Sequence, residues 1–169
     1  MCIRDRLYIE RHDYLRDIEM EQYSKAWDTW NNEQEKSKKD SEPKVNFSGS
    51  ENELKKAADA FRELVTEFPK HPRADAALYA LAQSLARLGK DTSVQYYKQL
   101  IDNYPKSPLL PDAYLSLGEY YFDKHQISEA ISNYKKVTAF KQHRAYLYAI
   151  YKLGWANYNA PQSLSLIHI

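Results

Sequence analysis

The sequence repeats itself with a period of 36 residues. A shift by this period places Phe68-Pro69 on Tyr104-Pro105 and Leu81-Ala82 on Leu117-Gly118, and a second shift carries the latter pair onto Leu153-Gly154. Apolar residues recur at helical spacing, Gly and Pro separate the helical stretches, and no stretch alternates as a β strand would. Two helices per period predict stacked helical hairpins, because neighbouring hairpins bury a core that one hairpin cannot bury alone.

Residues 111–144 carry the pattern most completely. Large residues surround a Leu-Gly pair on the first helix, and a small residue and an aromatic follow on the second; in order they are Tyr114, Leu117, Gly118, Tyr121, Ala130, Tyr134 and Val137. This pattern resembles the tetratricopeptide repeat family. The resemblance extends over 57–160 and is weak over 7–56. It implies an all-α fold, a right-handed α-solenoid of helical hairpins, preceded here by one long amphipathic helix.

The resemblance also implies which side chains form the core. Small residues should lie where two helices cross closely, and large ones should fill the surrounding space. The expected core residues are Phe61, Leu64, Leu81, Ala82, Tyr97, Leu100, Tyr114, Leu117, Gly118, Tyr121, Ala130, Tyr134, Leu153 and Gly154.

The organisation expected along the chain has three parts. A helix over 7–39 comes first, because apolar residues recur in it at helical spacing without Pro or Gly. A linker over 40–51 follows, rich in Ser with Pro and Gly, and then the array over 52–160. The array divides into half repeat 52–72, repeat 73–108, repeat 109–143 and half repeat 144–160. We expect the helix over 7–39 to act as the missing partner of the first half repeat.

The two ends do not continue the patterns beside them. MCIRDR (1–6) and LSLIHI, at the end of the segment 161–169, resemble translated sequencing-adapter sequence of the kind found in metagenomic gene predictions. We therefore expect both ends to be artefacts and the chain to be a fragment of a longer protein. The alternative is a frayed helix start and a short apolar tail. Without 1–6, the chain has no cysteine.

Charge and motifs argue against several functions. Lys and Arg number 24 and Asp and Glu 23; residues 7–56 hold 9 basic and 12 acidic residues, a net of −3, and residues 57–160 hold 13 and 10, a net of +3. Nucleic-acid binding is therefore not expected, and no apolar run is long enough to span a membrane. The histidines are scattered and no nucleophile–base motif occurs. We expect no enzyme activity, no metal and no cofactor.

The resemblance implies a groove, lined by the first helix of each hairpin, that receives partner peptides. The positions carried over are Tyr79, Gln83, Arg87, Leu115, Glu119, Phe122, Tyr148, Tyr151 and Trp155. Amphipathic rings suit such a surface. The alternative is that several of these rings belong to the core, or that a further helix covers those of the last helix.

The leading expectation is a non-catalytic scaffold that binds a protein or peptide. The turns FPKHP and YPKSPLLPDAY resemble those of bacterial envelope repeats, as in the periplasmic Tol–Pal coordinator and the outer-membrane barrel-assembly lipoprotein. This resemblance implies a periplasmic or outer-membrane-associated protein. The alternative is a regulatory or targeting module of a larger enzyme or secretion machine. Self-association through a coiled coil of 7–39 is disfavoured, because its apolar spacing drifts from heptads.

Overall fold

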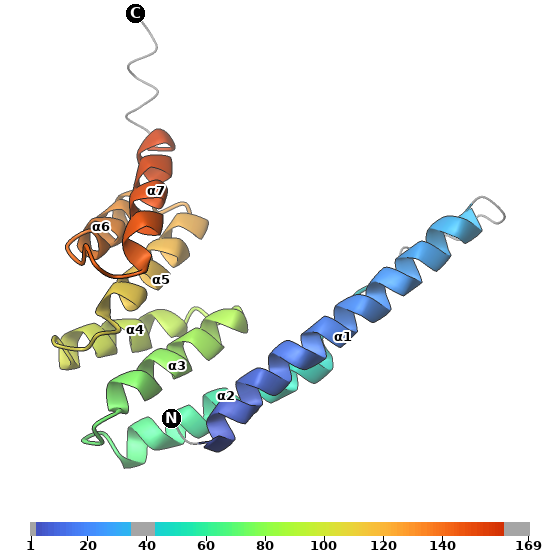
Figure 1. Cartoon of the computed structure of the whole chain (residues 1–169), viewed down its shortest axis with the longest axis horizontal. Coiled ribbons are helices and arrows are strands. Elements are labelled where there is room, and N and C mark those ends of the chain that lie inside the picture. The colour runs from blue at the N-terminus through green and yellow to red at the C-terminus, as the bar shows by residue number, and fades with distance from the viewer. Residues whose placement is uncertain (1–2, 35–42, 161–169) are drawn as a thin grey trace, which may run out of the picture.

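The computed structural model describes residues 3–34 and 43–160 (Figure 1). Over these ranges the chain forms seven helices and no strand, which confirms the all-α helical-repeat solenoid. The helices are α1 (Ile3–Gln34), α2 (Ser48–Glu67), α3 (Ala74–Arg87), α4 (Ser93–Asn103), α5 (Leu110–Asp123), α6 (Ile127–Val137) and α7 (Ala145–Tyr158). None of the helices in the described ranges has both the length and the apolar character that a membrane span requires.

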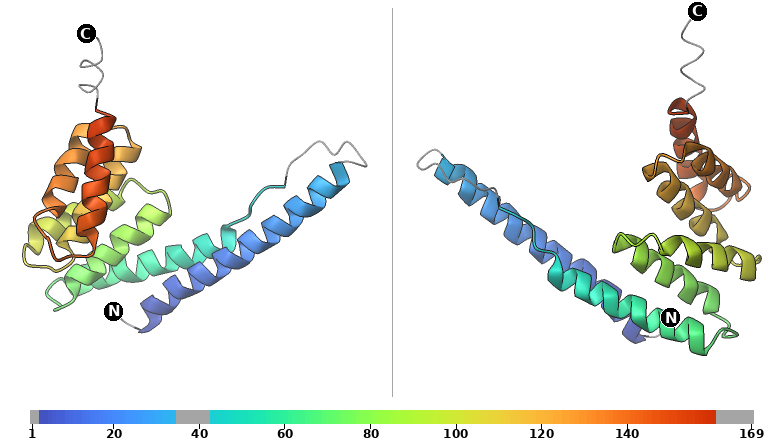
Figure 2. Two further views of the ribbon diagram at one scale, coloured as in Figure 1. Left: turned by 45° about the horizontal axis from the view of Figure 1, so that its top comes forward. Right: turned by 180° about the vertical axis from the view of Figure 1, so that it is seen from behind.

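Each helix packs against the next along the chain, and α5 also contacts α7. The helices α3 to α7 stack into the array. Helix α1 lies beside α2 and extends away from the array (Figures 1 and 2). The first half repeat thus takes its partner helix from α1.

The core consists of clusters that follow the repeat. One cluster joins α2 to α3 around Phe61 and Leu81, the next joins α3, α4 and α5 around Leu100, and another joins α5, α6 and α7 around Tyr134. The expected core residues found buried are Phe61, Leu81, Ala82, Tyr97, Leu100, Leu117, Gly118, Ala130 and Tyr134. Half-buried are Leu64, Tyr114, Tyr121 and Leu153.

Two glycines at equivalent positions of the repeat have opposite surroundings. A Cβ on Gly118 would lie 2.4 Å from Cε1 of Tyr134, so α5 and α6 cross too closely for any side chain there. A Cβ on Gly154 would have no atom within 4 Å. The expectation that Gly154 is a core residue is therefore wrong. It is exposed, because no described helix packs against that side of α7.

The helix boundaries correct the expected organisation at two points. The first helix begins at Ile3, so residues 3–6 continue it instead of lying outside the fold. The segment 40–51 is not linker throughout, because α2 begins at Ser48. Residues 1–2 and 161–169, and the expected end of the first helix at residue 39, lie outside the described residues.

The expected amphipathic character of α1 is only partly present. Tyr14 is 66% exposed and Met20 is also exposed, whereas Leu15 and Ile18 are half-buried and His12 is buried. The reason is geometric. The described part of α1 packs mainly against one helix, α2, so most of its circumference faces solvent.

A carboxylate of α1 caps the start of α2. Oε1 of Glu19 accepts hydrogen bonds from the backbone amides of Gly49 (3.0 Å) and Ser50 (3.2 Å), and Oε2 accepts one from the Ser50 hydroxyl (2.6 Å). These amides are among the helix donors that lack an intrahelical acceptor, and a negative charge at a helix N-terminus is favoured. The cap explains why helix begins inside a Ser- and Gly-rich stretch that alone predicts a loop.

We expect Glu19→Ala to lower the free energy of unfolding by about 1 kcal/mol, the usual cost of losing a helix cap. Desolvation raises the Glu19 pKa, but the hydrogen bonds from Ser50 and Gly49 and the charge of Arg16 outweigh it, so the pKa lies below its ordinary value of 4.5. The cap therefore contributes fully above that ordinary value and is lost as the pH falls through the lowered pKa.

Urea unfolding followed by circular dichroism, at neutral pH and at acid pH, measures this effect. Asp17→Ala, which removes an exposed carboxylate from the same helix, serves as the control. Equal stability of the two variants at neutral pH would show that the cap contributes nothing.

Candidate partner-binding surface

The three groove positions expected on α3 are largely occupied by contacts within the protein. Tyr79 is half-buried, with its ring centroid 5.8 Å from that of Tyr97 in an edge-on arrangement. Burial raises the pKa of both phenols, that of Tyr97 to about 12. Gln83 is half-buried, and Arg87 forms an ion pair with Asp13 of α1 at 2.9 Å. At this end of the groove Tyr79 thus packs partly into the core, and Arg87 remains exposed while paired with α1.

On α5 the expected groove residues are half-buried. Leu115 and Phe122 pack against the cluster around Tyr134. Oε1 of Glu119 accepts a hydrogen bond from the hydroxyl of Tyr134 at 2.7 Å, and its Oε2 lies 2.8 Å from Nζ of Lys152 on α7. Glu119 on α5 thus bonds both to the buried Tyr134 of α6 and to Lys152 of α7.

Lys152 contacts expected groove residues of both α5 and α7, although it was not itself among the expected residues. Its Nζ lies 5.0 Å from the ring centroid of Phe122 and 5.8 Å from that of Tyr148, within the range of cation–π attraction. Burial lowers the Lys152 pKa, but its hydrogen bond to Glu119 and the charge of that carboxylate raise the pKa above its ordinary value. The signal in the sequence was a lysine among the aromatic residues of α7, four positions after Tyr148.

The expected groove residues of α7 are exposed. Tyr148, Tyr151 and Trp155 all present their rings to solvent, and the Trp155 ring stacks on that of Tyr158 at 5.8 Å. Leu147 and Ile150 are exposed on the same helix. The buried side of α7 consists of Ala145, Ala149 and Ala156. This helix therefore carries a broad exposed aromatic surface.

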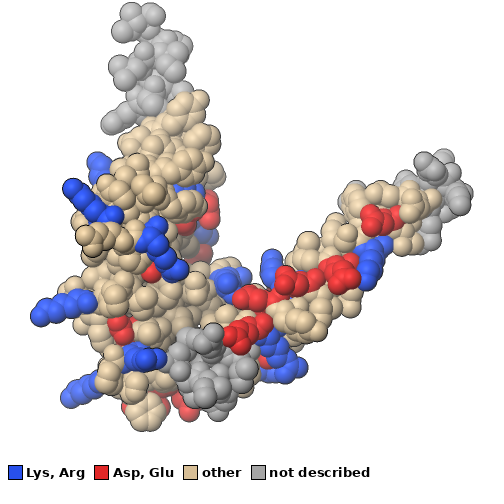
Figure 3. Space-filling model, in the orientation of Figure 1, with Lys and Arg blue, Asp and Glu red and all other residues tan. Residues whose placement is uncertain are grey.

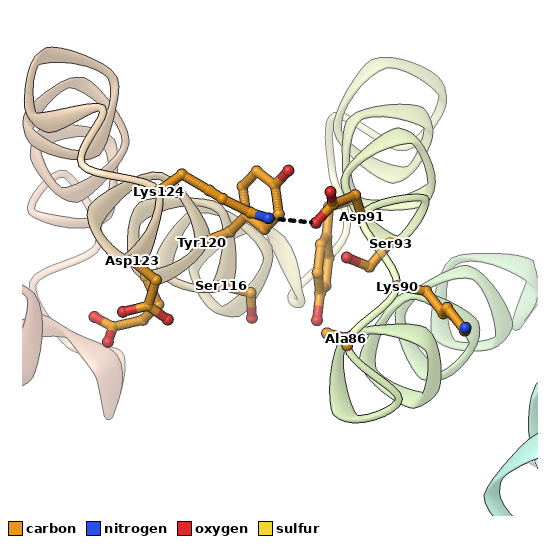
Figure 4. Close-up of a pocket in the computed structure, with 11 residues that line it drawn as sticks. Ala86, Lys90, Asp91, Ser93, Ser116, Tyr120, Asp123 and Lys124 are labelled. Carbon is orange, nitrogen blue, oxygen red and sulfur yellow. Dashed lines mark ion pairs between the residues drawn. The ribbon is translucent and has the colours of Figure 1, made fainter.

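Two hollows open beside the turns between paired helices. The first, of about 390 Å³, lies between the α3–α4 turn and α5, and is shown in Figure 4. The second, of about 560 Å³, lies between the α5–α6 turn and α7, where Phe122 and Trp155 line it. In the first, Asp91 pairs with Lys124 at 2.9 Å, and this hydrogen bond lowers the Asp91 pKa.

The turns beside these hollows share one backbone geometry. After α3, Gly89 has φ of 66°, and the amide of Lys90 donates to the carbonyl of Leu85. After α5, His125 takes the same place with φ of 58°, and the amide of Gln126 donates to the carbonyl of Tyr121. This helix ending favours glycine, so His125 holds a conformation that costs a side-chain-bearing residue free energy.

Charge is distributed differently over the two parts of the molecule. Lys and Arg are scattered over the array, while acidic side chains follow the length of α1 (Figure 3). This matches the opposite net charges of the two segments of the sequence. Within residues 3–34 and 43–160, no three His, Cys, Asp or Glu side chains gather in a way that could hold a metal ion.

Comparison with known protein families gives a match within the array. Residues 76–107 match a model of the tetratricopeptide repeat. The matched segment begins within the first turn of α3 and runs through α4 into the turn that follows, and so falls on the repeat expected over 73–108. The comparison with curated proteins finds no match. The stacked hairpins and this match together support a tetratricopeptide repeat family for the chain.

Proposed function

We propose that the chain is a non-catalytic scaffold that binds a partner protein or peptide on the surface formed by α5 and α7. A tetratricopeptide repeat suggests a protein–protein interaction module. The observation that carries the proposal is the exposed aromatic surface of α7, where Tyr148, Tyr151 and Trp155 face solvent. Large rings with one polar edge are enriched where proteins bind partners, because they bury much area for few rotatable bonds.

The neighbouring contacts suit such a surface. The ion pair of Glu119 with Lys152 fixes α7 against α5. Lys152 also lies beside the rings of Phe122 and Tyr148, which favours one arrangement of these side chains before any partner arrives. A preorganised surface loses less conformational entropy on binding.

Peptides selected from a random displayed library against the whole chain test the proposal. We expect Tyr148→Ala and Tyr151→Ala each to weaken the selected peptides by about tenfold, as measured by fluorescence polarisation, with the helical circular dichroism signal unchanged. Tyr14→Ala, which removes an exposed tyrosine from α1, should leave the affinity unchanged. Selected peptides that bind both α7 variants as tightly as the parent chain would overturn the proposal.

The proposal also places the protein in the bacterial cell envelope, as part of a longer repeat protein. Its support is the resemblance of the turns FPKHP (68–72) and YPKSPLLPDAY (104–114) to those of envelope repeat proteins. Fractionation of cells that express the complete reading frame tests this placement. Recovery with periplasm or outer membrane supports it, and recovery only in the cytoplasm contradicts it.

A further inference from the structure

The two hollows beside the helix-pair turns occupy equivalent places in the repeat. The 36-residue shift that relates the repeats carries five of the residues that line the first hollow onto residues that line the second. The equivalent pairs are Ala86 and Phe122, Gly89 and His125, Asp91 and Ile127, Glu119 and Trp155, and Asp123 and Asn159. Helical-hairpin stacking has therefore made a depression at the same place in both repeats, of about 390 Å³ in the first and about 560 Å³ in the second.

The second hollow lacks the three carboxylates of the first at the equivalent positions, where Ile127, Trp155 and Asn159 take the places of Asp91, Glu119 and Asp123. The first hollow holds the carboxylates of Asp91, Glu119 and Asp123, whereas the second presents the side chains of Phe122, Ile127 and Trp155, with Asp123 at its edge. The first hollow thus carries these carboxylates together with the cations of Lys90 and Lys124, whereas the second has large apolar side chains at the positions equivalent to Asp91 and Glu119.

Asp123 lines both hollows, so they adjoin at the C-terminal end of α5. Two of the carboxylates of the first hollow already have cations, since Asp91 pairs with Lys124 and Glu119 with Lys152. Among the described residues no direct ion pair involves Asp123, which is exposed, although its charge also attracts Lys152 and helps to raise the pKa of that lysine. In Figure 4 the side chain of Lys90 points away from Asp123, on the opposite side of the hollow. The shared edge therefore presents a carboxylate that can accept an outside cation.

We propose that the two hollows together bind one extended peptide segment in which a basic side chain is next to a large aromatic one. The basic group pairs with Asp123, and the aromatic ring enters the space between Phe122 and Trp155. Because Asp123 belongs to both walls, the two side chains come from neighbouring residues of one segment. This inference rests on the proposed function, and it names the chemistry of the partner.

Both the aromatic and the basic side chain of the peptide contribute to its binding free energy. An aromatic ring placed against Phe122 and Trp155 removes apolar area from water on both partners, and aromatic pairs add an attraction of their own. The charge pair adds less, because Asp123 is exposed, but it decides which peptides bind. An acidic peptide would meet the carboxylate of Asp123 and bind less tightly.

Three capped tetrapeptides test the inference on the whole chain: acetyl-Gly-Arg-Trp-Gly-amide, its Glu-Trp counterpart and its Arg-Ala counterpart. We expect the Arg-Trp peptide to shift the amide NMR resonances of residues 122–127 and 155–159. It should bind about fivefold more tightly than the Glu-Trp peptide. This ratio corresponds to the largest contribution that an exposed ion pair usually makes to affinity. Binding of the Arg-Ala peptide should be about tenfold weaker, because the ring supplies most of the buried area.

Variants of the chain separate the contribution of the ion pair with Asp123 from that of the buried aromatic ring. In Asp123→Asn the preference for Arg-Trp over Glu-Trp should disappear, whereas in Trp155→Ala both Trp peptides should weaken together. Asp17→Asn, which removes an exposed carboxylate from α1, is the control and should leave the preference intact. Resonance shifts elsewhere in the chain, or a preference that survives in Asp123→Asn, would overturn the inference.

The outcome separates this inference from the proposed function. If Tyr148→Ala and Tyr151→Ala weaken library-selected peptides but Asp123→Asn leaves the tetrapeptide preference unchanged, the binding surface stands and the paired hollows are wrong. If neither set of variants has an effect, both proposals fail.

Discussion

Gly118→Leu is expected to abolish the folding of the α5–α6 hairpin, and Gly118→Ala to lower the free energy of unfolding by about 1 to 3 kcal/mol. The first added carbon would lie 2.4 Å and 2.6 Å from two ring carbons of Tyr134, which is a clash for any side chain. The ring has no space to move, because Tyr134 is 0% exposed and its hydroxyl is held by Glu119. The helices would have to separate, and the core around Tyr134 would lose its packing.

The matched control is Gly154→Ala, at the equivalent position of the next repeat. A Cβ there meets no atom within 4 Å, so only the higher helix propensity of alanine acts, and the variant should be more stable by about 0.5 to 1 kcal/mol. Urea unfolding of both variants by circular dichroism measures the difference. If both variants shift stability in the same direction, the assigned crossing of α5 and α6 is wrong.

A double variant tests the cause of the loss. In a Tyr134→Leu background the ring that clashes is absent, so adding Gly118→Ala should cost less than it does in the parent chain. Equal costs in the two backgrounds would show that the effect of Gly118→Ala does not come from Tyr134.

Phe61→Ala should lower the free energy of unfolding by about 3 to 5 kcal/mol, the range for a fully buried aromatic ring. Phe61 is 1% exposed and lies in the cluster that joins α2 to α3, with Ala57, Leu81 and Leu85 around it. The cavity left behind would fall at the junction between the α1–α2 pair and the array. We therefore expect amide hydrogen exchange to rise in α2 and α3 more than in α6.

Phe68→Ala makes the same chemical change at the end of the same helix. Phe68 is 62% exposed, so its loss should alter stability by no more than about 0.5 kcal/mol. A large effect of Phe68→Ala, or a small effect of Phe61→Ala, would contradict the assignment of this core cluster.

Much of the array follows from the repeat pattern. The apolar periodicity predicted the helical hairpins, and residues such as Leu81, Leu100 and Tyr134 lie buried where the pattern indicates core. The pattern is informative here because each hairpin packs mainly on its neighbours in the chain, so position in the period largely determines which face is covered.

Other features depended on contacts that no local pattern contains. The start of α2 at Ser48 depends on Glu19, about thirty residues earlier in the chain. Tyr79 was expected in the groove but is half-buried, with the ring of Tyr97 packed edge-on against it. The role of Lys152 depends on Glu119, which lies on another helix.

The sequence by itself determined the helical class, the period of 36 residues and the residue types of the hairpin core, because these are properties of spacing along the chain. The tertiary structure decided which equivalent positions are covered and which are open. Gly118 and Gly154 occupy the same place in the repeat, yet one lies against Tyr134 and the other faces open space. The physical reason is that burial depends on the neighbouring helix, and the spacing of residues within one helix does not say whether a neighbour is there.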